Sequence, residues 1–486
     1  MTDVRDTIFA LSSGRPPAAI AVIRISGPQA GAALSALTGR VPTPRRASFV
    51  RVREPTSGEV IDEGLALWFP RPHSETGEDI AELQIHGGRA VIAATLRALA
   101  KLPGLRHAEA GEFTRRAFEN GRMDLTAVEG LADLVAAETE AQRRQAYHHL
   151  KGLLGDRAET WRQQLIEALA LVEAGIDFAE EDDVPATAMT QAIARIQPLA
   201  EEIEEACGGS GERLREGLRV AIAGPPNAGK STLFNRLARR EAAIVSPFPG
   251  TTRDVLELHL DLGGFPVTVL DTAGIRETDD PVELEGVRRA RDQAAQASLV
   301  LWVEDATQHV GDRSVGRASE IMPLTSALRC AQADLLPALR GKGAKPHPTW
   351  VGEAGKGLLG AVVWRIVNKI DLLDPKSIST LRHTGKVYFV SGTTGEGINE
   401  LLTAIQSFCE GFFLPEPALV TRARQRGHLN DTATALRNAK EAAAQGREEI
   451  VAEHLRLATR SLGKLLGRVD VEDILDVIFR DFCIGK

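Results

Sequence analysis

Cysteine is scarce in this chain of 486 residues. The four copies, at positions 207, 330, 409 and 483, are scattered, and no two have CxxC spacing. Aromatic residues are also few, at 5% of the chain, with only two tyrosines. The cysteine pattern argues against a disulfide framework or a structural zinc site, and it fits a reducing cytosol.

Long apolar runs and an excess of basic residues are missing too. No run of about 18 apolar residues occurs, so no membrane-spanning helix and no membrane partner are predicted. The N-terminus, Met1–Asp6, lacks the charged-then-apolar layout of a signal peptide. The net charge of -8 argues against nucleic-acid binding by the whole surface, although a local basic face is compatible with it. We therefore expect a cytoplasmic protein.

The length predicts two to four domains, because one hydrophobic core does not extend over 486 residues. Residues 1–122 show a mixed α/β pattern, with strands expected at 18–25, 65–69 and 80–86 and a helix over 89–101. On the last of these strands Glu82 and His86 face the same side. They line either a ligand pocket or, more simply, a solvated sheet face.

Two helical segments flank a second α/β region. Residues 123–216 and 411–486 carry apolar residues at helical spacing, whereas 217–410 alternates strands and helices and predicts a mainly parallel sheet. The helical segments would form one bundle into which the α/β domain is inserted. The predicted fold is thus multidomain: a mixed α/β N-terminal domain, a central helical bundle and an inserted Ras-like P-loop domain. Strands of the inserted domain are expected at 219–223, 255–260, 266–270, 299–303, 363–367 and 387–390.

Three stretches interrupt this organisation. Glu180–Asp183 is an acidic cluster that we interpret as a solvated loop rather than a metal site. Gly208–Gly211 is glycine-rich and is expected to be a linker. The segment 306–361 is longer than one helix and its loops require, so we expect a mobile insertion on the surface of the inserted domain.

The stretch Gly224-Pro-Pro-Asn-Ala-Gly-Lys-Ser231 lies between a predicted strand and a predicted helix. This is the strand–GxxxxGK[ST]–helix pattern of a phosphate-binding loop. Its glycines let backbone N–H groups turn toward phosphate oxygens, and the helix that follows adds its positive end. Lys230 would reach the β and γ phosphates and assist catalysis, and the Ser231 hydroxyl would bind Mg²⁺.

Short motifs after later strands indicate which nucleotide is bound. Asp371 of Asn368-Lys-Ile-Asp371 can accept two hydrogen bonds from guanine, which adenine cannot donate. Asn368 and Lys369 would brace the loops around the base, and backbone groups of Ser391-Gly392 would read guanine O6. These motifs predict a GTP-binding switch domain.

Two further motifs belong to the γ-phosphate end of such a site. In Asp271-Thr-Ala-Gly274, Asp271 would hold Mg²⁺ through water and the Gly274 N–H would sense the phosphate. Thr252 would complete the Mg²⁺ coordination. Residue 275 is Ile, where Ras-type GTPases carry the Gln that orients the attacking water. We therefore expect a carboxylate of the segment 276–285 to position the water, and a monovalent cation beside Asn227 to supply positive charge.

The chain as a whole resembles the tRNA modification GTPase family MnmE, also called TrmE. The segment Gly111-Glu-Phe-Thr-Arg-Arg-Ala-Phe-Glu-Asn-Gly-Arg-Met-Asp-Leu125 looks like a signature of that family, and the ending Phe482-Cys-Ile-Gly-Lys486 looks like its C-terminal Cys motif. The resemblance implies a folate-binding and dimerising N-terminal domain (1–122), a helical domain in two parts (123–216 and 411–486) and an inserted G domain (217–410).

The family's activity is the expectation that follows. Together with the flavoprotein MnmG, in a heterotetramer, members add a carboxymethylaminomethyl-type group at C5 of the wobble uridine of certain tRNAs. A tetrahydrofolate derivative, the 5-formyl or 5,10-methylene form, supplies the one-carbon unit. GTP, Mg²⁺ and K⁺ are the other expected ligands. A homodimer is expected through the N-terminal domains, with a GTP-dependent contact between G domains.

The resemblance also implies residue roles. Glu283 corresponds to the family's catalytic glutamate. K⁺ would be held by Asn227, Ser246, Phe248 and Thr251. The nucleotide would be contacted by Asn227, Ala228, Gly229, Lys230, Ser231, Thr232, Ser246, Thr251, Thr252, Asp271, Thr272, Ala273, Gly274, Asn368, Lys369, Asp371, Ser391 and Gly392. The folate would be contacted by Arg24, Glu82, Arg122 and Lys486.

Two of these assignments leave alternatives open. Arg122 stands where some relatives carry Lys, so a planar fork replaces a point charge at that contact. Cys483 is either a small buried hydrophobe between Phe482 and Ile484, or a nucleophile or redox-sensitive group beside the one-carbon donor. The competing function is a ribosome-assembly or regulatory GTPase of the Era or Der type, without modification chemistry.

Overall fold

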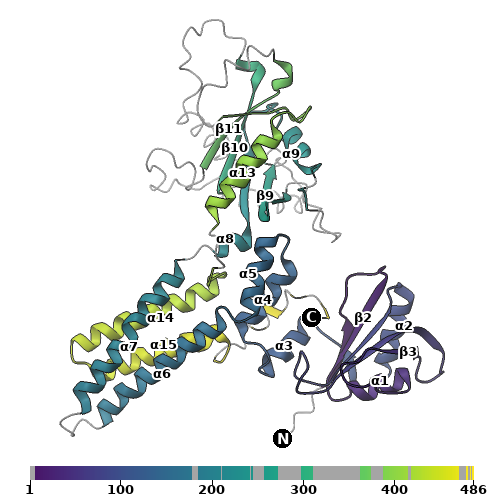
Figure 1. Ribbon diagram of the computed structural model, residues 1–486, viewed down its shortest axis with the longest axis vertical. Helices are drawn as coiled ribbons and strands as arrows, with labels where there is room; N and C mark the ends of the chain where they lie inside the picture. Colours follow the sequence, from purple (N-terminus) through teal and green to yellow (C-terminus); the bar gives the residue numbers. More distant parts are fainter. Residues whose placement is uncertain are drawn as a thin grey trace, which may run out of the picture. The chain divides into compact units, whose positions relative to one another are not determined.

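The computed structural model describes residues 6–177, 184–208, 211–240, 242–244, 257–271, 297–309, 362–373, 387–413 and 418–469, with 475, 478–479, 482 and 484–485 near the C-terminus (Figure 1). The chain forms two compact units. Unit 1 comprises residues 1–135, 146–208 and 423–486, and unit 2 comprises 136–145 and 209–422. Unit 2 is therefore inserted within the sequence of unit 1, and it includes residues 136–145, which the sequence had placed in the helical domain.

The N-terminal part of unit 1 contains a six-stranded sheet in the order β3-β4-β5-β2-β1-β6. Neighbouring strands are antiparallel except β1 and β6. The strands are β1 (Thr7–Leu11), β2 (Ile20–Ser26), β3 (Ser48–Arg53), β4 (Val60–Phe69), β5 (Ile80–His86) and β6 (Leu105–His107). The helices are α1 (Ala30–Thr38), α2 (Arg89–Ala100) and α3 (Glu112–Glu119).

Successive side chains along β2 and β5 point to opposite faces of this sheet. Ile23, Ile25, Leu83 and Ile85 are buried in one core with residues of α1 and α2. Since side chains alternate along a strand, Arg24 and Glu82 lie on the opposite face. The predicted strands and the predicted helix of this region are all present, whereas β1, β3, β6, α1 and α3 were not predicted.

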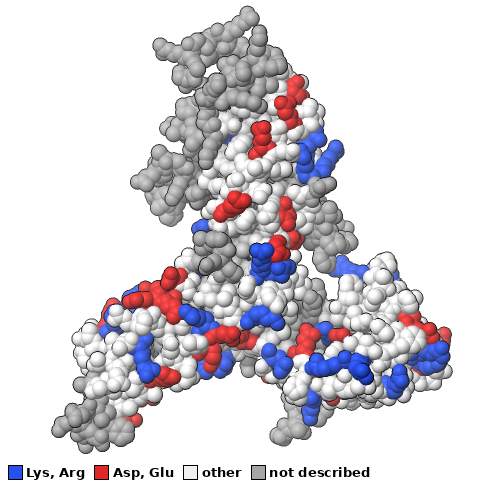
Figure 2. All heavy atoms as spheres, viewed as in Figure 1, with Lys and Arg blue, Asp and Glu red and all other residues white. Residues whose placement is uncertain are grey.

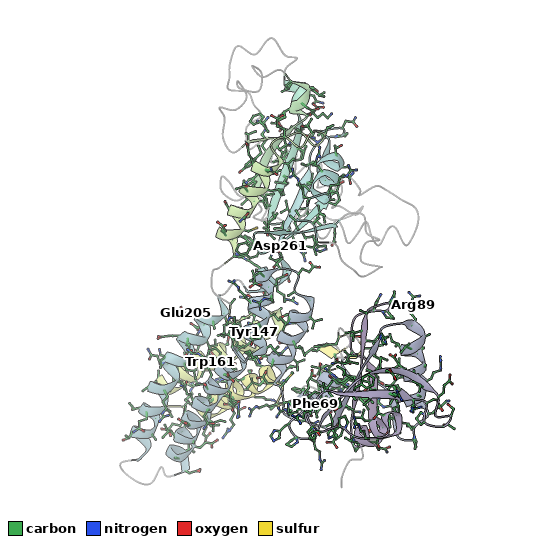
Figure 3. The ribbon with its side chains drawn as sticks, turned by 45° about the vertical axis from the view of Figure 1, so that its right-hand side comes forward. Phe69, Arg89, Tyr147, Trp161, Glu205 and Asp261 are labelled. Carbon is green, nitrogen blue, oxygen red and sulfur yellow. The ribbon has the colours of Figure 1, made fainter. Side chains whose placement is uncertain are left out.

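The rest of unit 1 is helical. Helices α6 (Gly155–Asp177), α7 (Val184–Cys207), α14 (Ala423–Ala444) and α15 (Glu448–Leu466) pack together, and Trp161 of α6 is buried in this bundle (Figures 1 and 3). The bundle is preceded in sequence by α4 (Leu125–Ala136) and α5 (Glu140–Leu150). Of the helices in the described ranges, none combines the length and the hydropathy that crossing a bilayer requires.

A buried ion pair joins the first and last sequence segments of unit 1. Glu129 of α4 is 2% exposed and accepts hydrogen bonds from Arg424 Nε and Nη2 at 2.8 and 3.0 Å, and from Gln425 Nε2 at 2.8 Å. Segments that are almost 300 residues apart in the sequence thus fold against each other. This contact agrees with the predicted insertion of an α/β domain into a helical one.

Unit 2 contains a second six-stranded sheet, in the order β12-β11-β10-β7-β9-β8. Every neighbouring pair is parallel except β8 with β9, so the predicted mainly parallel sheet is confirmed. The strands are β7 (Leu218–Ala223), β8 (Glu257–Leu262), β9 (Phe265–Asp271), β10 (Leu299–Asp305), β11 (Val362–Asn368) and β12 (Val387–Phe389). The helical elements are α8 (Gly211–Glu216), α9 (Lys230–Ala238), η3 (Ala306–His309), η5 (Ile370–Leu372) and α13 (Ile398–Phe412).

Several sequence predictions differ from this structure or fall outside it. Gly211 of the expected linker Gly208–Gly211 is buried and begins helix α8. Strand β8 ends at Leu262 rather than 260, because the turn to β9 is made by Gly263 and Gly264, both at positive φ. The predicted insertion 306–361 begins with η3, so Ala306–His309 is ordered helix, and its remaining residues lie outside the described ones. The acidic cluster Glu180–Asp183 also lies outside them.

Charges are mixed over the surface. On the face drawn in Figure 2, Lys and Arg side chains are interspersed with Asp and Glu side chains. This agrees with the modest net charge of -8.

Candidate functional site

The loop between β7 and α9 has the backbone of a phosphate-binding loop. Gly224 has φ of 142°, and a Cβ added there would lie 2.1 Å from the carbonyl oxygen of Val303, so only glycine fits. Asn227 and Gly229 also have positive φ, of 62° and 92°. Helix α9 then begins at Lys230. The chain therefore turns sharply at the positive end of a helix, where an anion is stabilised.

Several side chains predicted to serve the nucleotide phosphates lie in or beside this loop. The Lys230 ammonium donates hydrogen bonds to the carbonyl oxygens of Gly224 and Pro225 at 2.8 and 2.9 Å. Ser231 and Thr232, in the first turn of α9, are exposed. Asp271 ends β9, is 7% exposed, and is the strand partner of Ile222 in β7. The carboxyl end of that strand pair therefore brings Asp271 beside the start of the loop, as a Mg²⁺-water ligand requires.

The Asn368 side chain ties the phosphate loop to the loop after β12. It is 1% exposed, and its Nδ2 donates to the carbonyl oxygens of Ala228 and Gly229 at 2.9 and 3.4 Å. Its Oδ1 accepts a bond from the Gly392 N–H at 3.0 Å. Asn368 therefore makes three hydrogen bonds to two loops, as a bracing role requires.

The two backbone donors predicted to read guanine O6 are already engaged. The Gly392 N–H is bonded to Asn368, and the Ser391 N–H donates to the carbonyl oxygen of Glu396 at 2.9 Å. In this arrangement one of these N–H groups is thus bonded to the end of β11 and the other within its own loop. Asp371, the predicted guanine acceptor, is exposed on η5.

Asp305 was missed by the sequence reasoning. Lys369 has φ of 68°, and its Nζ lies 2.6 Å from Asp305 Oδ2, at the end of β10. The other carboxylate oxygen of Asp305 accepts bonds from the N–H and hydroxyl of Thr307. Burial raises the pKa of Asp305, but the bonds from Lys369 and Thr307 outweigh it and leave the pKa below its usual value. The signal was present, since Asp305 follows a buried strand just as Asp271 does.

A second candidate site lies in the N-terminal sheet of unit 1. Arg24 of β2 faces its strand partner Glu82 of β5, and both side chains are less than one-fifth exposed. Arg24 Nε and Nη2 lie 3.0 and 2.9 Å from Glu82 Oε1, and Nη1 lies 2.7 Å from Glu75 Oε2. The guanidinium also lies 5.9 Å from the ring centroid of Phe113. The predicted pair is therefore brought together, with Glu75 as an added partner.

The other predicted residues of that site are placed differently. Arg122 is exposed, and its Cγ would lie 3.3 Å from a Cβ added at Gly77. Lys486 lies outside the described residues, but the carbonyl oxygen of Gly485 accepts a bond from Ser12 Oγ at 2.7 Å. Gly485 thus lies at the end of β1, the strand that pairs with β2. His86 instead forms an exposed pair with Asp62 at 2.9 Å, as expected for a solvated sheet face.

Many predicted site residues fall outside the described ranges. In the nucleotide site they are Ser246, Phe248, Thr251, Thr252, Thr272, Ala273, Gly274 and Glu283. Cys483 is outside them too, while its neighbours Phe482 and Ile484 are buried and exposed respectively. In the described part of the chain no group of three His, Cys, Asp or Glu side chains is placed to hold a metal ion.

The phosphate loop, the Asn-Lys-Ile-Asp motif and the mainly parallel sheet define unit 2 as a GTP-binding domain of the P-loop class. Two family models match the chain: "MnmE helical domain" over residues 125–483 and "GTP-binding protein TrmE N-terminus" over residues 7–122. The chain therefore belongs to the MnmE family of tRNA modification GTPases.

Individual relatives agree with this assignment. A tRNA modification GTPase MnmE from a Bradyrhizobium species is 52% identical over 485 residues and covers 99% of both chains. The protein of the same name from Rhodospirillum rubrum is 49% identical over 497 residues, also with 99% coverage of both. Among solved structures, Era of Aquifex aeolicus is 23% identical, covers 45% of this chain and 66% of its own, and has a TM-score of 0.24.

Proposed function

We propose that this protein is a K⁺-stimulated GTPase that modifies tRNA together with the flavoprotein MnmG. In this proposal it adds a carboxymethylaminomethyl-type group at C5 of the wobble uridine, using a one-carbon unit from tetrahydrofolate. The observation that carries the proposal is that one chain combines a guanine-nucleotide site with the Arg24–Glu82 pair in a TrmE-type N-terminal domain. An assembly GTPase of the Era or Der type has no use for the second site.

The nucleotide site supports GTP hydrolysis in the following way. Lys230 and the N–H groups of the loop stabilise charge on the β and γ phosphates. Ser231 and Thr252 would ligate Mg²⁺, and Asp271 would hold it through water. The Asp371 carboxylate would select guanine over adenine by accepting two hydrogen bonds. Replacing it with Asn should shift the preference from GTP toward xanthosine triphosphate.

The proposed dependence on K⁺ rests on two residues, Asn227 of the phosphate loop and Ile275 after the Asp-Thr-Ala-Gly motif. Asn227 is exposed at positive φ, so its amide oxygen is available beside the phosphates. Residue 275 is Ile, which cannot orient water. We assign K⁺ to Asn227, with Ser246, Phe248 and Thr251, and we assign positioning of the water to Glu283. Turnover of GTP should be faster in K⁺ than in Na⁺; equal rates would contradict the role of Asn227.

The folate derivative is assigned to Arg24, Glu82, Arg122 and Lys486. The Glu82 carboxylate suits the amino and N–H donors of a pterin ring, and Arg24 fixes that carboxylate. The cationic Arg122 and Lys486 suit the negative glutamate tail. Either the 5-formyl or the 5,10-methylene derivative provides these groups. When bound, the derivative supplies the one-carbon unit.

The N-terminal domain is assigned to homodimerisation. The sheet face that carries Arg24 also carries exposed apolar side chains: Phe49 and its strand partner Leu65 are 60% and 39% exposed, and Ile20 is 61% exposed. Large exposed apolar side chains on one sheet face favour a protein interface. In the full assembly two copies would bind MnmG as a heterotetramer, with a GTP-dependent contact between G domains. Action on tRNA places the assembly in the cytoplasm.

The experiment for the whole proposal is a comparison of tRNA nucleosides. tRNA from cells that lack the gene should have lost the modified wobble uridine, which mass spectrometry of digested tRNA detects. An unchanged wobble uridine would contradict the proposed function. Unchanged modification together with a defect in ribosome assembly would favour the Era-type alternative.

A further inference from the structure

A short loop between β4 and β5 contacts both arginines of the proposed folate site. The loop, Ser74–Asp79, is named here the Glu75 loop. Glu75 Oε2 lies 2.7 Å from Arg24 Nη1. Gly77, at φ of 78°, faces Arg122 closely enough that a Cβ there would lie 3.3 Å from Arg122 Cγ. One loop is therefore close to two side chains that come from distant parts of the domain.

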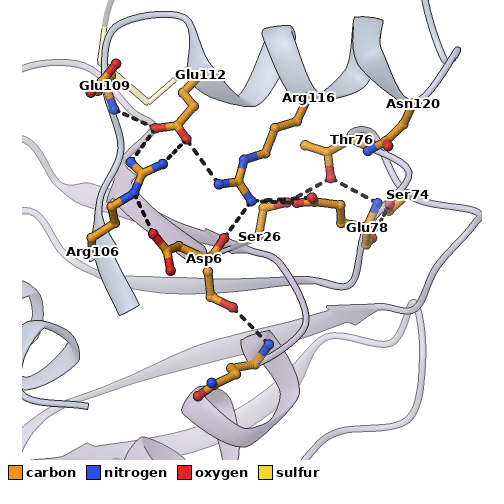
Figure 4. A network of polar contacts seen from close by, with 12 residues as sticks. Asp6, Ser26, Ser74, Thr76, Glu78, Arg106, Glu109, Glu112, Arg116 and Asn120 are labelled. Atoms are coloured by element: carbon orange, nitrogen blue, oxygen red, sulfur yellow. Dashed lines mark hydrogen bonds and ion pairs between the residues drawn. The ribbon is translucent and has the colours of Figure 1, made fainter. Parts of the chain in front are cut away.

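Buried hydrogen bonds to Ser26 and Asn120 hold the Glu75 loop in place (Figure 4). Ser26 Oγ and Thr76 Oγ1, both fully buried, are 2.8 Å apart, and Ser26 Oγ also donates to Glu78 Oε2 at 2.8 Å. Asn120 Nδ2 donates to the carbonyl oxygen of Thr76 at 2.7 Å. Buried and fully bonded polar groups fix a loop in one conformation. The backbone that carries Glu75 is thus rigid.

A buried arginine completes this anchor. Arg116 of α3 is 5% exposed, and its Nη1 lies 3.1 and 3.3 Å from the two carboxylate oxygens of Glu78. The same Nη1 donates to the carbonyl oxygen of Asp6 at 2.8 Å, and Nη2 donates to Glu112 at 3.1 Å. Figure 4 shows Arg116 reaching from its helix to the loop. Helix α3 is therefore linked directly to the Glu75 loop.

The Glu75 side chain itself is 46% exposed, whereas Arg24 is only 18% exposed. An ion pair with so exposed a partner contributes little to folding stability. Its geometric effect is larger. Glu82 engages Nε and Nη2 of the guanidinium, and Glu75 engages the remaining nitrogen, Nη1. Bonds on both edges of the planar fork fix its orientation, which Glu82 alone would leave free to tilt.

We propose that Glu75 is a positioning residue of the folate site, which acts by fixing the Arg24 guanidinium and through it the Glu82 carboxylate. The proposal rests on the proposed function of that site. It adds a residue to the four that the family resemblance assigned to this site. It also gives the Glu75 loop, which Arg116 anchors, a role in ligand recognition.

The test is calorimetric titration of the full-length protein with 5-formyltetrahydrofolate. Glu75→Ala should raise the Kd by about threefold to fivefold, the range expected for loss of one partly exposed ion pair. Glu75→Gln, which keeps one hydrogen bond to Arg24, should fall between wild type and Glu75→Ala. GTP turnover of each variant reports whether unit 2 is intact and should be unchanged.

Glu63→Ala is the matched control. Glu63 is 48% exposed and lies 2.7 Å from Arg51 on the same sheet, so it resembles Glu75 in exposure and partner but touches no residue of the proposed site. This variant should bind the ligand as wild type does. If Glu63→Ala weakens binding as much as Glu75→Ala, the effect is general and the proposal is overturned.

A double variant separates positioning from a general structural effect. In an Arg24→Gln background the additional Glu75→Ala change should alter the Kd by less than about twofold, because the residue through which Glu75 acts is gone. An undiminished effect there, or a wild-type Kd for Glu75→Ala alone, would overturn the positioning role. Failure of the wild-type protein to bind 5-formyltetrahydrofolate would instead overturn the folate site itself, and this proposal with it.

Discussion

Replacing Asn368 with Ala should disconnect the phosphate loop from the loop after β12. The variant removes hydrogen bonds of 2.9 and 3.0 Å, and it leaves a buried carbonyl of Ala228 and a buried N–H of Gly392 without their present partner. A buried group that loses its partner costs about 1–3 kcal/mol, and about 1–2 kcal/mol where water can partly replace the partner, as is expected for these two loops. The arrangement of the two loops should therefore lose roughly 2–4 kcal/mol.

This cost should appear mainly as weaker nucleotide binding. If the loops must regain the ordered arrangement to bind GTP, 2–4 kcal/mol corresponds to a Kd about 30- to 1000-fold higher. Titration with a fluorescent GTP analogue measures the change, and thermal unfolding shows whether unit 2 remains folded. Asn235→Ala, at an exposed position of α9, is the control and should bind normally. Equal affinities of Asn368→Ala and Asn235→Ala would refute the bracing role.

Two further predictions concern stability. Glu129→Ala should destabilise unit 1 by about 3–5 kcal/mol, because it leaves Arg424 and Gln425 without their buried acceptor. The control Glu173→Ala removes an exposed pair with Arg456 and should cost less than about 1 kcal/mol. Similar unfolding midpoints of the two variants in denaturant would contradict this prediction. Burial raises the pKa of the Cys409 thiol in the folded protein to about 12. The thiol of the unfolded chain loses its proton at lower pH, so the free energy of unfolding should fall as pH rises above about 8.5. Unfolding at pH 7 and pH 10 should show a smaller fall for Cys409→Ala than for wild type, and an equal fall would remove this residue as a cause.

The nucleotide site was predictable because its chemistry is local in sequence. Glycines at fixed offsets produce the turn before α9, and Asn368 follows directly on a buried strand. The roles of these glycines and of Asn368 depend on where the parallel strands end, and the apolar runs in the sequence indicate those ends. Positive φ at Gly224 and Gly229 is what the motif demands, and it is found.

The contacts between distant segments were not predictable in this way. Asp305 is recognisable as a polar residue after a strand, but its bond to Lys369 depends on the register of β10 with β11. The contact of Glu75 with Arg24 depends on a loop whose anchors, Ser26 and Asn120, are 50 and 44 residues from Thr76. Periodicity carries no information about such pairs.

The central claim is that one chain uses GTP hydrolysis and a folate-type site for the same modification. It is tested by restoring the gene to cells that lack it, as wild type, as Lys230→Ala and as Glu82→Gln, and measuring the modified wobble uridine in their tRNA. The account predicts that wild type restores the nucleoside and that neither variant does, although both proteins accumulate. Full restoration by either variant would contradict it.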